Sequence, residues 1–392
     1  MSDTSTPAPS EPPLPEAAAG SAATGAPAIE PARRASPWRR SIGFIGVNNL
    51  SLIIALIVVV GIVIWQSPRG AGGAPLFLTW QNLMNSLAQS IVIVGLLAVG
   101  ETVVIVAGGL DISIGSIASV ASVTAGIALV SGLFGIIPAG SMQMGIVIGI
   151  LTGVVLGMGN GLIVTVLNVN PIIATLGTLA AYAGLAFLIA PGGKPVGVVT
   201  QPDFTWLGTG RIFEGAPIPN LGSSPWTGIP VIFLALLLVA ALFHILMRYT
   251  DFGRAIYAIG GNAVAARLAG INVRRVKIGM YILSGAAAGL AGVLLTARTT
   301  SGNPINGQGL ELQAITAVFL GGAATTGGKG TIVGTVLAVV LVGVLNNGMN
   351  LLGVNTFYQR VALGVLLIGA VAISQWRQTR SERARTRIAA AG

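Results

Sequence analysis

The run IVIGILTGVVLGMGNGLIVTVL at residues 146–167 decides the fold class of this chain. Its residues are apolar on every face of a helix, and about 20 such residues are enough to cross the hydrocarbon core of a bilayer. A strand of a membrane barrel would instead alternate apolar and polar residues. The run therefore predicts a transmembrane α-helix.

Similar apolar runs recur along the whole chain of 392 residues. Hydrophobic residues make up 53% of the sequence and charged residues only 8%, against about 25% charged residues in soluble domains. This composition excludes a soluble globular protein. It predicts an all-α, polytopic helical membrane protein.

Counting the apolar runs gives about ten predicted transmembrane helices. They lie near residues 44–65, 86–107, 115–134, 145–167, 172–190, 229–247, 278–296, 311–326, 331–348 and 358–376. The eighth run is short and flanked by glycines, which predicts a broken or tilted helix.

The distribution of basic residues predicts which side of the membrane each segment faces. With ten spans, six of them before the loop 248–277, 16 of the 21 Lys and Arg residues fall on one side. Basic residues collect on the cytosolic side of membrane proteins, so both termini and this loop are predicted to be cytosolic. The predicted domains are a disordered Pro/Ala-rich arm (1–40), a permease domain (41–376) and a basic tail (377–392).

Several functions are excluded by what the sequence lacks. There is no cysteine and a single histidine, His244, so thiolate metal sites and a Ser-His-Asp triad are excluded. The glycine-rich run 321–331 departs from the phosphate-binding loop at Ala323 and Gly330. We therefore expect no cofactor or metal on this chain, and any ATP chemistry on another subunit. The net charge of +10 lies in short clusters between apolar runs, which argues against a nucleic-acid partner and for contact with membrane lipid.

The loop 248–277 contains a short segment with helix signals at both ends. Asn262 is a favourable N-cap and Gly270 a favourable residue just after a helix. A short helix on a cytosolic loop is a rigid knob for a partner's groove. The residues assigned to this contact are Gly261, Asn262, Ala265, Ala266, Leu268 and Gly270. A simple positive-inside loop would explain the charges of the segment but not its caps.

Polar residues at the ends of spans are candidates for the translocation path. These are Asp111, Ser113, Asn170, Thr175, Asn346 and Asn347. A carboxylate at membrane depth is a functional candidate, yet Asp111 can also cap the next helix, and the two roles can coexist. Asn170 precedes Pro171 at a predicted helix start, so it can be structural. The asparagines at 346 and 347 either contact a polar solute or end a helix.

Five motifs occur here in the order seen in a known family. They are GGLDISIG (108–115), NPIIATLGT (170–178), AIGGNAVAARLAGINVRRVK (258–277), ELQAITAVFLGGAATTGGKGT (311–331) and LNNGMNLLGVN (345–355). Together they resemble the membrane subunit of ribose-type ATP-binding-cassette importers, a branch related to branched-chain amino-acid permeases. The resemblance covers residues 45–376. One departure is visible, because Gln313 stands where the family usually has aspartate.

The resemblance implies a type II-like importer permease in a bacterial inner membrane, forming the path for a monosaccharide or related polyol. It implies three partners: a cytosolic cassette ATPase, often a tandem fusion, which carries ATP and Mg; a periplasmic sugar-binding protein; and a second permease subunit, identical or different. The segment 261–270 resembles the coupling helix that sits in a cleft of the ATPase.

Other functions remain open from the sequence. An ion-coupled secondary transporter would need intramembrane ionisable groups, for which only Glu101 and Asp111 are serious candidates. A permease of the same superfamily for a non-sugar solute, such as an amino acid, is a further alternative. An intramembrane enzyme is disfavoured, because cysteine, any histidine besides His244 and a paired-carboxylate constellation are missing. The sequence does not name the sugar.

Overall fold

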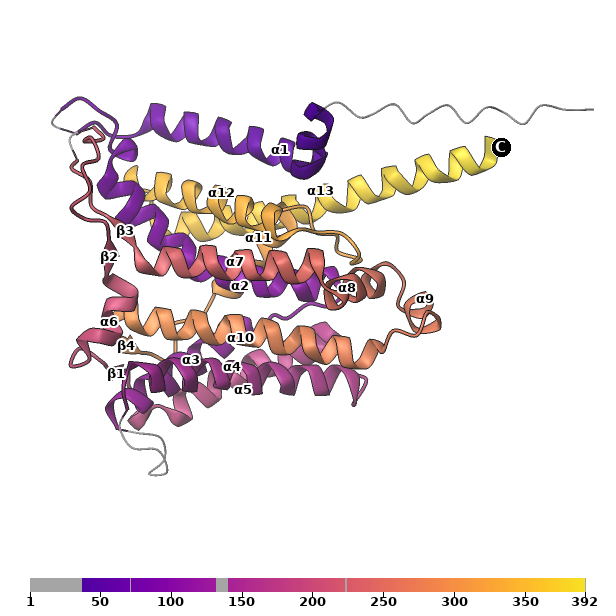
Figure 1. Cartoon of the computed structure of the whole chain (residues 1–392), viewed down its shortest axis with the longest axis horizontal. Helices are drawn as coiled ribbons and strands as arrows, with labels where there is room; N and C mark the ends of the chain where they lie inside the picture. Colours follow the sequence, from indigo (N-terminus) through magenta and orange to yellow (C-terminus); the bar gives the residue numbers. More distant parts are fainter. Residues whose placement is uncertain (1–36, 71, 132–139, 223, 392) are drawn as a thin grey trace, which may run out of the picture. The chain divides into compact units, whose positions relative to one another are not determined.

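The computed structural model describes residues 37–70, 72–131, 140–222 and 224–391 (Figure 1). The chain separates into two compact units, residues 1–44 and 45–392. Most of the predicted arm 1–40 lies outside the described residues. Residues 37–40, which were predicted to belong to the arm, are already helical, because the first helix begins at Pro37.

The described residues are mainly helical. The α-helices are α1 (Pro37–Gln66), α2 (Ala88–Val106), α3 (Ile114–Val130), α4 (Met142–Thr165), α5 (Pro171–Ile189), α6 (Pro202–Thr209), α7 (Val231–Tyr249), α8 (Asp251–Gly261), α9 (Ala263–Leu268), α10 (Val273–Thr299), α11 (Leu310–Leu320), α12 (Ile332–Leu351) and α13 (Thr356–Ala391). Short helical segments are η1 (Leu76–Leu78), η2 (Gln81–Leu87) and η3 (Pro191–Gly193). The strands are β1 (Val196–Gly197), β2 (Arg211–Ile212), β3 (Ile229–Pro230) and β4 (Ser301–Gly302).

Within the described residues, 6 helices are long and apolar enough to cross a membrane. They are Gln81–Val106, Met142–Thr165, Pro171–Ile189, Val231–Tyr249, Val273–Thr299 and Ile332–Leu351. Shorter apolar helices, at Leu50–Gln66, Ile114–Val130, Leu310–Leu320 and Thr356–Ala372, fall on the remaining predicted spans. The predicted fold class, a polytopic helical membrane protein, is confirmed.

The eighth predicted span is shorter in the structure than in the prediction. The sequence pattern placed it at 311–326, but α11 ends at Leu320. Gly321 caps the helix and Gly322 has a φ of 93°, a left-handed conformation that glycine adopts without steric cost. The chain therefore leaves the helix at the paired glycines and continues as a loop to α12.

The centre of residues 45–392 is formed by α2 and α3. Every residue of α3 from Ile114 to Leu129 is buried, and α2 is buried from Ile91 to Val106. The helices α10, α4 and α5 pack around α3, while α7, α11 and α12 pack against α2. The two helices therefore contact protein along almost their whole length, although their sequences are as apolar as those of lipid-facing helices.

A row of glycines brings α4 against α10. The buried glycines of α4 recur at every fourth position: Gly145, Gly149, Gly153, Gly157 and Gly161. A β-carbon on Gly153 would overlap the carbonyl oxygen of Gly285 on α10, and a β-carbon on Gly285 would overlap that of Gly153. Small residues let helix backbones approach closely in membranes, where dispersion and weak polar contacts drive association.

Short strand pairs hold the loops at one end of these helices. β1 pairs with β4, and β2 pairs with β3, each antiparallel. Trp80 packs edge-on against Trp226 with ring centroids 4.8 Å apart, and its indole N–H donates to the carbonyl of Pro219 at 3.0 Å. Figure 1 shows α6 and the four strands at this end, and α8 and α9 at the opposite end.

Candidate translocation pathway

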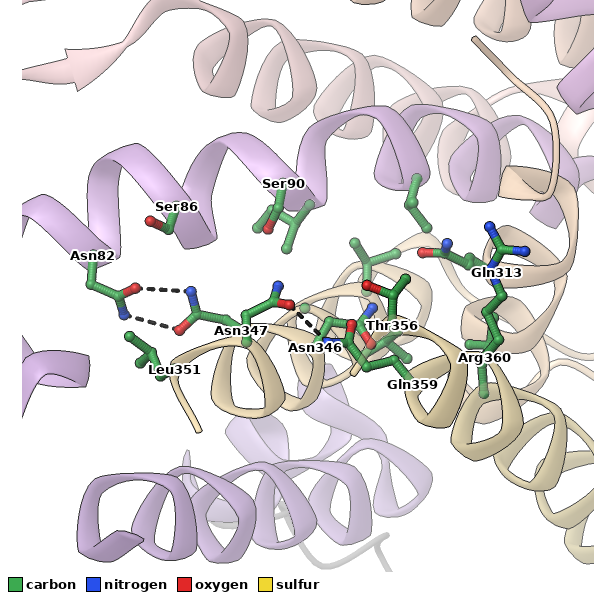
Figure 2. A pocket seen from close by; sticks show the side chains of 17 residues that line it. Asn82, Ser86, Ser90, Gln313, Asn346, Asn347, Leu351, Thr356, Gln359 and Arg360 are labelled. Atoms are coloured by element: carbon green, nitrogen blue, oxygen red, sulfur yellow. Dashed lines mark hydrogen bonds between the residues drawn. The ribbon is translucent and has the colours of Figure 1, made fainter. Parts of the chain in front are cut away.

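A polar cavity of about 520 Å³ lies between η2, α2, α11, α12 and α13. We call it the amide pocket, because its walls carry the side-chain amides of Asn82, Gln313, Asn346, Asn347, Asn350 and Gln359. Its other polar lining residues are Ser86, Ser90, Thr356 and Arg360. Figure 2 labels these side chains, except that of Asn350, on the facing helices around the same space.

Two pairs of amides close part of the wall of this pocket. Asn82 and Asn347 exchange two hydrogen bonds, each amide nitrogen donating to the other's oxygen at 2.9 Å (Figure 2). Gln359 donates from Nε2 to Oδ1 of Asn350 at 2.8 Å. These bonds connect η2 to α12 and α12 to α13, so they fix the helices that form the pocket.

Asn82 and Ser86 reach the pocket from a rare type of helix. Residues Gln81–Leu87 form a π-helix that runs into α2. Turns of π-helix are uncommon in proteins and are found frequently at functional sites. The wider turn changes the direction of the side chains relative to an α-helix of the same sequence.

The sequence identified part of this pocket. Asn346 and Asn347 were predicted path residues, and both line it. Asn82, Gln359 and Arg360 were not among the predicted path residues, because no sequence signal relates a residue before the second predicted span to residues on the tenth. Gln313, the visible departure from the family pattern, also lines the pocket.

Asp111 and Ser113 lie in a second, fully buried polar cluster, between α2 and α3. Asp111 Oδ1 accepts hydrogen bonds from the backbone N–H of Ser113 at 2.9 Å and from its hydroxyl at 2.6 Å. The amide nitrogen of Asn160, on α4, lies 3.2 Å from Asp111 Oδ2 and 2.7 Å from Ser113 Oγ. Glu101 Oε1 accepts the N–H of Asp111 at 2.9 Å. The cluster therefore ties α2, the turn and α4 together.

This geometry gives Asp111 two structural contacts, while its predicted part in the translocation path stays a prediction. Its bond to the Ser113 N–H holds the turn that leads into α3, which begins at Ile114. It is not the N-cap residue itself, since Ser113 occupies that position. Its second oxygen instead bonds Asn160 on another helix, so the carboxylate also connects helices.

The remaining predicted path residues lie apart from the amide pocket. Thr175 is buried on α5, and its hydroxyl donates to the carbonyls of Pro171 at 2.9 Å and Leu110 at 3.3 Å. Asn170 is exposed and caps α5, accepting the N–H of Ile172 at 3.0 Å. The structure thus brings Thr175 next to the turn that precedes Asp111, and gives Asn170 the capping contact.

We expect Asp111→Asn to destabilise the protein even though asparagine caps helices well. The new amide nitrogen would face the amide nitrogen of Asn160, which already donates in this direction. Leaving a buried donor without an acceptor costs about 1–3 kcal/mol. Thermal unfolding of the detergent-solubilised protein should show this loss.

The double variant Asp111→Asn with Asn160→Asp is the matched control. It exchanges the carboxylate and the amide between the two positions, and should recover most of the lost stability. If the single variant unfolded at the wild-type temperature, Asp111 would act only on the turn.

The short helix predicted between Asn262 and Gly270 is present as α9 and has both predicted caps. Asn262 Oδ1 accepts the N–H groups of Val264 and Ala265 at 3.0 Å. After the helix, Gly270 has a φ of 85°, and the N–H of Ile271 donates back to Ala266 at 3.0 Å. This pattern of bonds is the Schellman motif, which ends helices at glycine.

The structure corrects one residue of the predicted contact face. Ala266 is only 4% exposed and packs against Ile259 and Val273, so it fixes α9 to the protein and cannot contact a partner. Val264 and Leu268 are 70% and 85% exposed. They lie four residues apart and therefore share the outward face of the helix.

Three glycine turns meet directly beside α9. We define the glycine junction as Gly108, Gly260, Gly261, Gly327 and Gly328. The N–H of Gly328 donates to the carbonyl of Val106 at 2.8 Å. A β-carbon on Gly327 would lie 2.8 Å from the nitrogen of Gly108, and one on Gly260 would overlap the Val106 carbonyl. The junction therefore joins the end of α8 to the α2–α3 turn and to the α11–α12 loop.

Tyr257 adds a hydrogen bond to this junction. Its hydroxyl donates to the carbonyl of Gly330 at 2.8 Å. Burial raises the pKa of the Tyr257 hydroxyl, and the nearby Arg248 lowers it by a smaller amount. The phenol is therefore protonated at neutral pH and available as a donor.

The described residues contain no group of three His, Cys, Asp or Glu side chains that could hold a metal ion. The buried polar cluster has two carboxylates, Glu101 and Asp111. Its other members supply amide and hydroxyl groups.

The fold and these sites define a membrane permease, and comparison with known proteins identifies its family. The profile described as "Branched-chain amino acid transport system / permease component" matches residues 82–371. The chain belongs to this family and is a multi-pass membrane protein. No solved structure matches it.

Curated relatives cover most of the chain. The "Ribose import permease protein RbsC" of Bacillus subtilis (strain 168) is 39% identical over 77% of this chain and 87% of its own length. The protein of the same name in Escherichia coli (strain K12) is 38% identical over 83% of this chain and 93% of its own length. The "L-arabinose ABC transporter permease protein AraH" of Azospirillum brasilense is 34% identical over 78% of this chain and 83% of its own length.

Proposed function

We propose that this chain is the translocation subunit of an ATP-driven importer that moves a monosaccharide or related polyol across the bacterial inner membrane. The chain forms the path and catalyses no covalent step. ATP and Mg are bound and used by a separate cytosolic ATPase, a tandem cassette fusion. A periplasmic binding protein delivers the sugar, and a second permease subunit completes the path.

The observation that carries this proposal is the attachment of α9 to the rest of the chain. Its outward face presents Val264 and Leu268, while the buried Ala266 and the glycine junction hold its base. A partner that moves α9 therefore also moves the α2–α3 turn and the α11–α12 loop. A permease powered by another subunit needs such a mechanical connection. Nucleotide binding to the ATPase can favour one conformation of the permease only if the contacts between the two subunits differ between its conformations.

The charge around α9 fits a partner with an acidic groove. Arg267, Arg274 and Arg275 are exposed near Val264 and Leu268. None of these arginines forms an ion pair within the described part of the chain, where the one salt bridge joins Arg254 to Asp251. An apolar centre with a charged rim is the usual anatomy of a protein–protein contact. In this proposal the outward face of α9 and both termini are cytosolic. The four strands and α6, at the opposite end of the helices, then lie on the periplasmic side.

We expect Leu268→Asp to uncouple the importer. A carboxylate on the most exposed apolar side chain of α9 would have to be buried in the partner groove, at a cost of several kcal/mol. ATP-driven sugar uptake in proteoliposomes should fall by a factor of ten or more, while the permease stays folded and in the membrane.

Leu268→Met is the matched control, because methionine keeps the apolar contact and should transport normally. Wild-type uptake by the aspartate variant would rule out α9 as the contact with the ATPase. Absence of any ATP-dependent monosaccharide uptake by the wild-type complex would rule out the proposed function itself.

A further inference from the structure

We propose that the amide pocket binds a neutral monosaccharide in transit, with Gln313 and Arg360 selecting which sugar enters. The inference rests on the proposed function and assigns its substrate site. Its volume of about 520 Å³ lies within the range of small-molecule sites, about 300–1,000 Å³.

The pocket offers polar groups that no other group in the described part of the protein uses. Five lining side chains form no hydrogen bond or ion pair within the described residues: Ser86, Gln313, Asn346, Thr356 and Arg360. Amides and hydroxyls both donate and accept hydrogen bonds, and a guanidinium donates in a fixed fork. A sugar ring carries hydroxyls that also donate and accept, so these groups match a polyol from several directions.

The other lining residues give the pocket an apolar wall. Ile91, Val94, Val339, Val342 and Leu363 face the same space, where they can contact the C–H faces of a sugar ring. None of the described lining residues is aromatic. The pocket therefore lacks the large aromatic contact area that dominates tight binding sites, which suits a site that must release its ligand.

The charge of the pocket gives Gln313 a specific role, while the choice of a neutral ligand rests on the proposed function. Arg360 is the one charged residue among the described lining side chains. Figure 2 shows Arg360 and Gln313 at the same end of the pocket. An aspartate at position 313 would place a carboxylate at the same end of the pocket as Arg360 and compete with a ligand for the guanidinium donors, whereas the amide of Gln313 carries no charge and leaves them available for hydroxyl oxygens.

The pocket is also connected to the cytosolic knob. Gln313 lies on α11, which leads through Gly321 and Gly322 to the loop of the glycine junction. Asn82 lies at the first turn of the π-helix before α2, and α2 ends at the same junction. Movement of α9 therefore reaches two walls of the amide pocket, which links sugar release to the ATPase cycle.

The absence of native cysteine gives a direct test that does not require transport. In the complex with its ATPase, Asn346→Cys should react with a small water-soluble thiol reagent. D-ribose, L-arabinose and D-glucose would each be added as probes, and at least one should slow the reaction severalfold. Thr209→Cys, at the exposed end of α6, should react at the same rate with and without sugar.

A transport measurement completes the test. Gln313→Asp and Asn346→Leu should each lower sugar uptake by up to about tenfold, the effect of one lost hydrogen bond. The binding protein should still stimulate ATP hydrolysis in both variants, which shows that the importer remains assembled and coupled. Gln143→Asp, outside the pocket, should leave uptake unchanged.

The results separate this proposal from the proposed function. Sugar-independent labelling of Asn346→Cys, or protection by D-gluconate alone, would overturn the neutral-sugar site even if the complex imports a monosaccharide. Protection by a neutral sugar would support the site even if Leu268→Asp transported normally and so ruled out α9 as the contact with the ATPase.

Discussion

Gly153→Ala should prevent α4 from packing on α10, and we expect little of this variant to reach a folded state in the membrane. The added methyl group would overlap the carbonyl of Gly285 and lie 2.7 Å from the Cα of Gly289. Both neighbours are backbone atoms, so no side chain can move aside. Overpacking a core costs about 1–3 kcal/mol when side chains can adjust, and here two helix backbones must separate.

Gly177→Ala is the matched control for this substitution. Gly177 lies on the neighbouring helix α5, and a β-carbon there would meet no atom within 4 Å. Alanine favours a helix over glycine by about 0.5–1 kcal/mol, so this variant should be as stable as the wild type or more so. Size-exclusion profiles and thermal unfolding of the two solubilised variants would compare them. Equal stability of both would show that the close approach of α4 and α10 is not needed.

Gly260→Ala should abolish most ATP-driven uptake while leaving the transmembrane helices folded. The methyl group would overlap the Val106 carbonyl and the Gly328 nitrogen, and so would push α8 away from the glycine junction. The disturbance lies at the end of the spans, so the helix contacts within the membrane should persist. We expect uptake to fall at least tenfold, which corresponds to about 1.4 kcal/mol.

A glycine outside the junction provides the control. Gly184→Ala makes the same chemical change on α5, where a β-carbon would meet nothing within 4 Å. Uptake and sugar-stimulated ATP hydrolysis should be near normal in this variant. Normal uptake in Gly260→Ala would mean that α9 moves the permease through other contacts.

Much of the fold follows from patterns that are local in the sequence. Long apolar runs predict spans, because the bilayer requires about 20 apolar residues in a row. The bounds of α9 were predicted because Asn262 and Gly270 act on their own neighbouring backbone groups. Each of these signals depends on a few consecutive residues.

The amide pocket could not be predicted in the same way. Asn82 and Asn347 bond each other across 265 positions of sequence, and the sequence does not state which faces of two apolar helices meet. The π-helix at Gln81–Leu87 has no simple sequence signal. Ala266 was misplaced for a related reason, since an Ala-rich segment gives no hydrophobic pattern to distinguish its inner face.

The complete burial of α3 has a consequence for how the protein is made. The helix is synthesised and inserted before α4, α5 and α10, the helices that surround it. At about 5–20 residues per second, translation from the end of α3 to the end of α10 takes roughly 10–30 s. During this time α3 must lie against lipid or the insertion machinery.

The polar cluster around Asp111 also lacks its contacts from later helices during this interval. Asp111 gains the Asn160 amide only when α4 arrives. Unsatisfied carboxylates are costly in hydrocarbon, so the nascent chain favours retention of α2 and α3 beside a partly hydrated insertase. The permease is therefore expected to depend on an insertion factor that holds early helices until late ones are made.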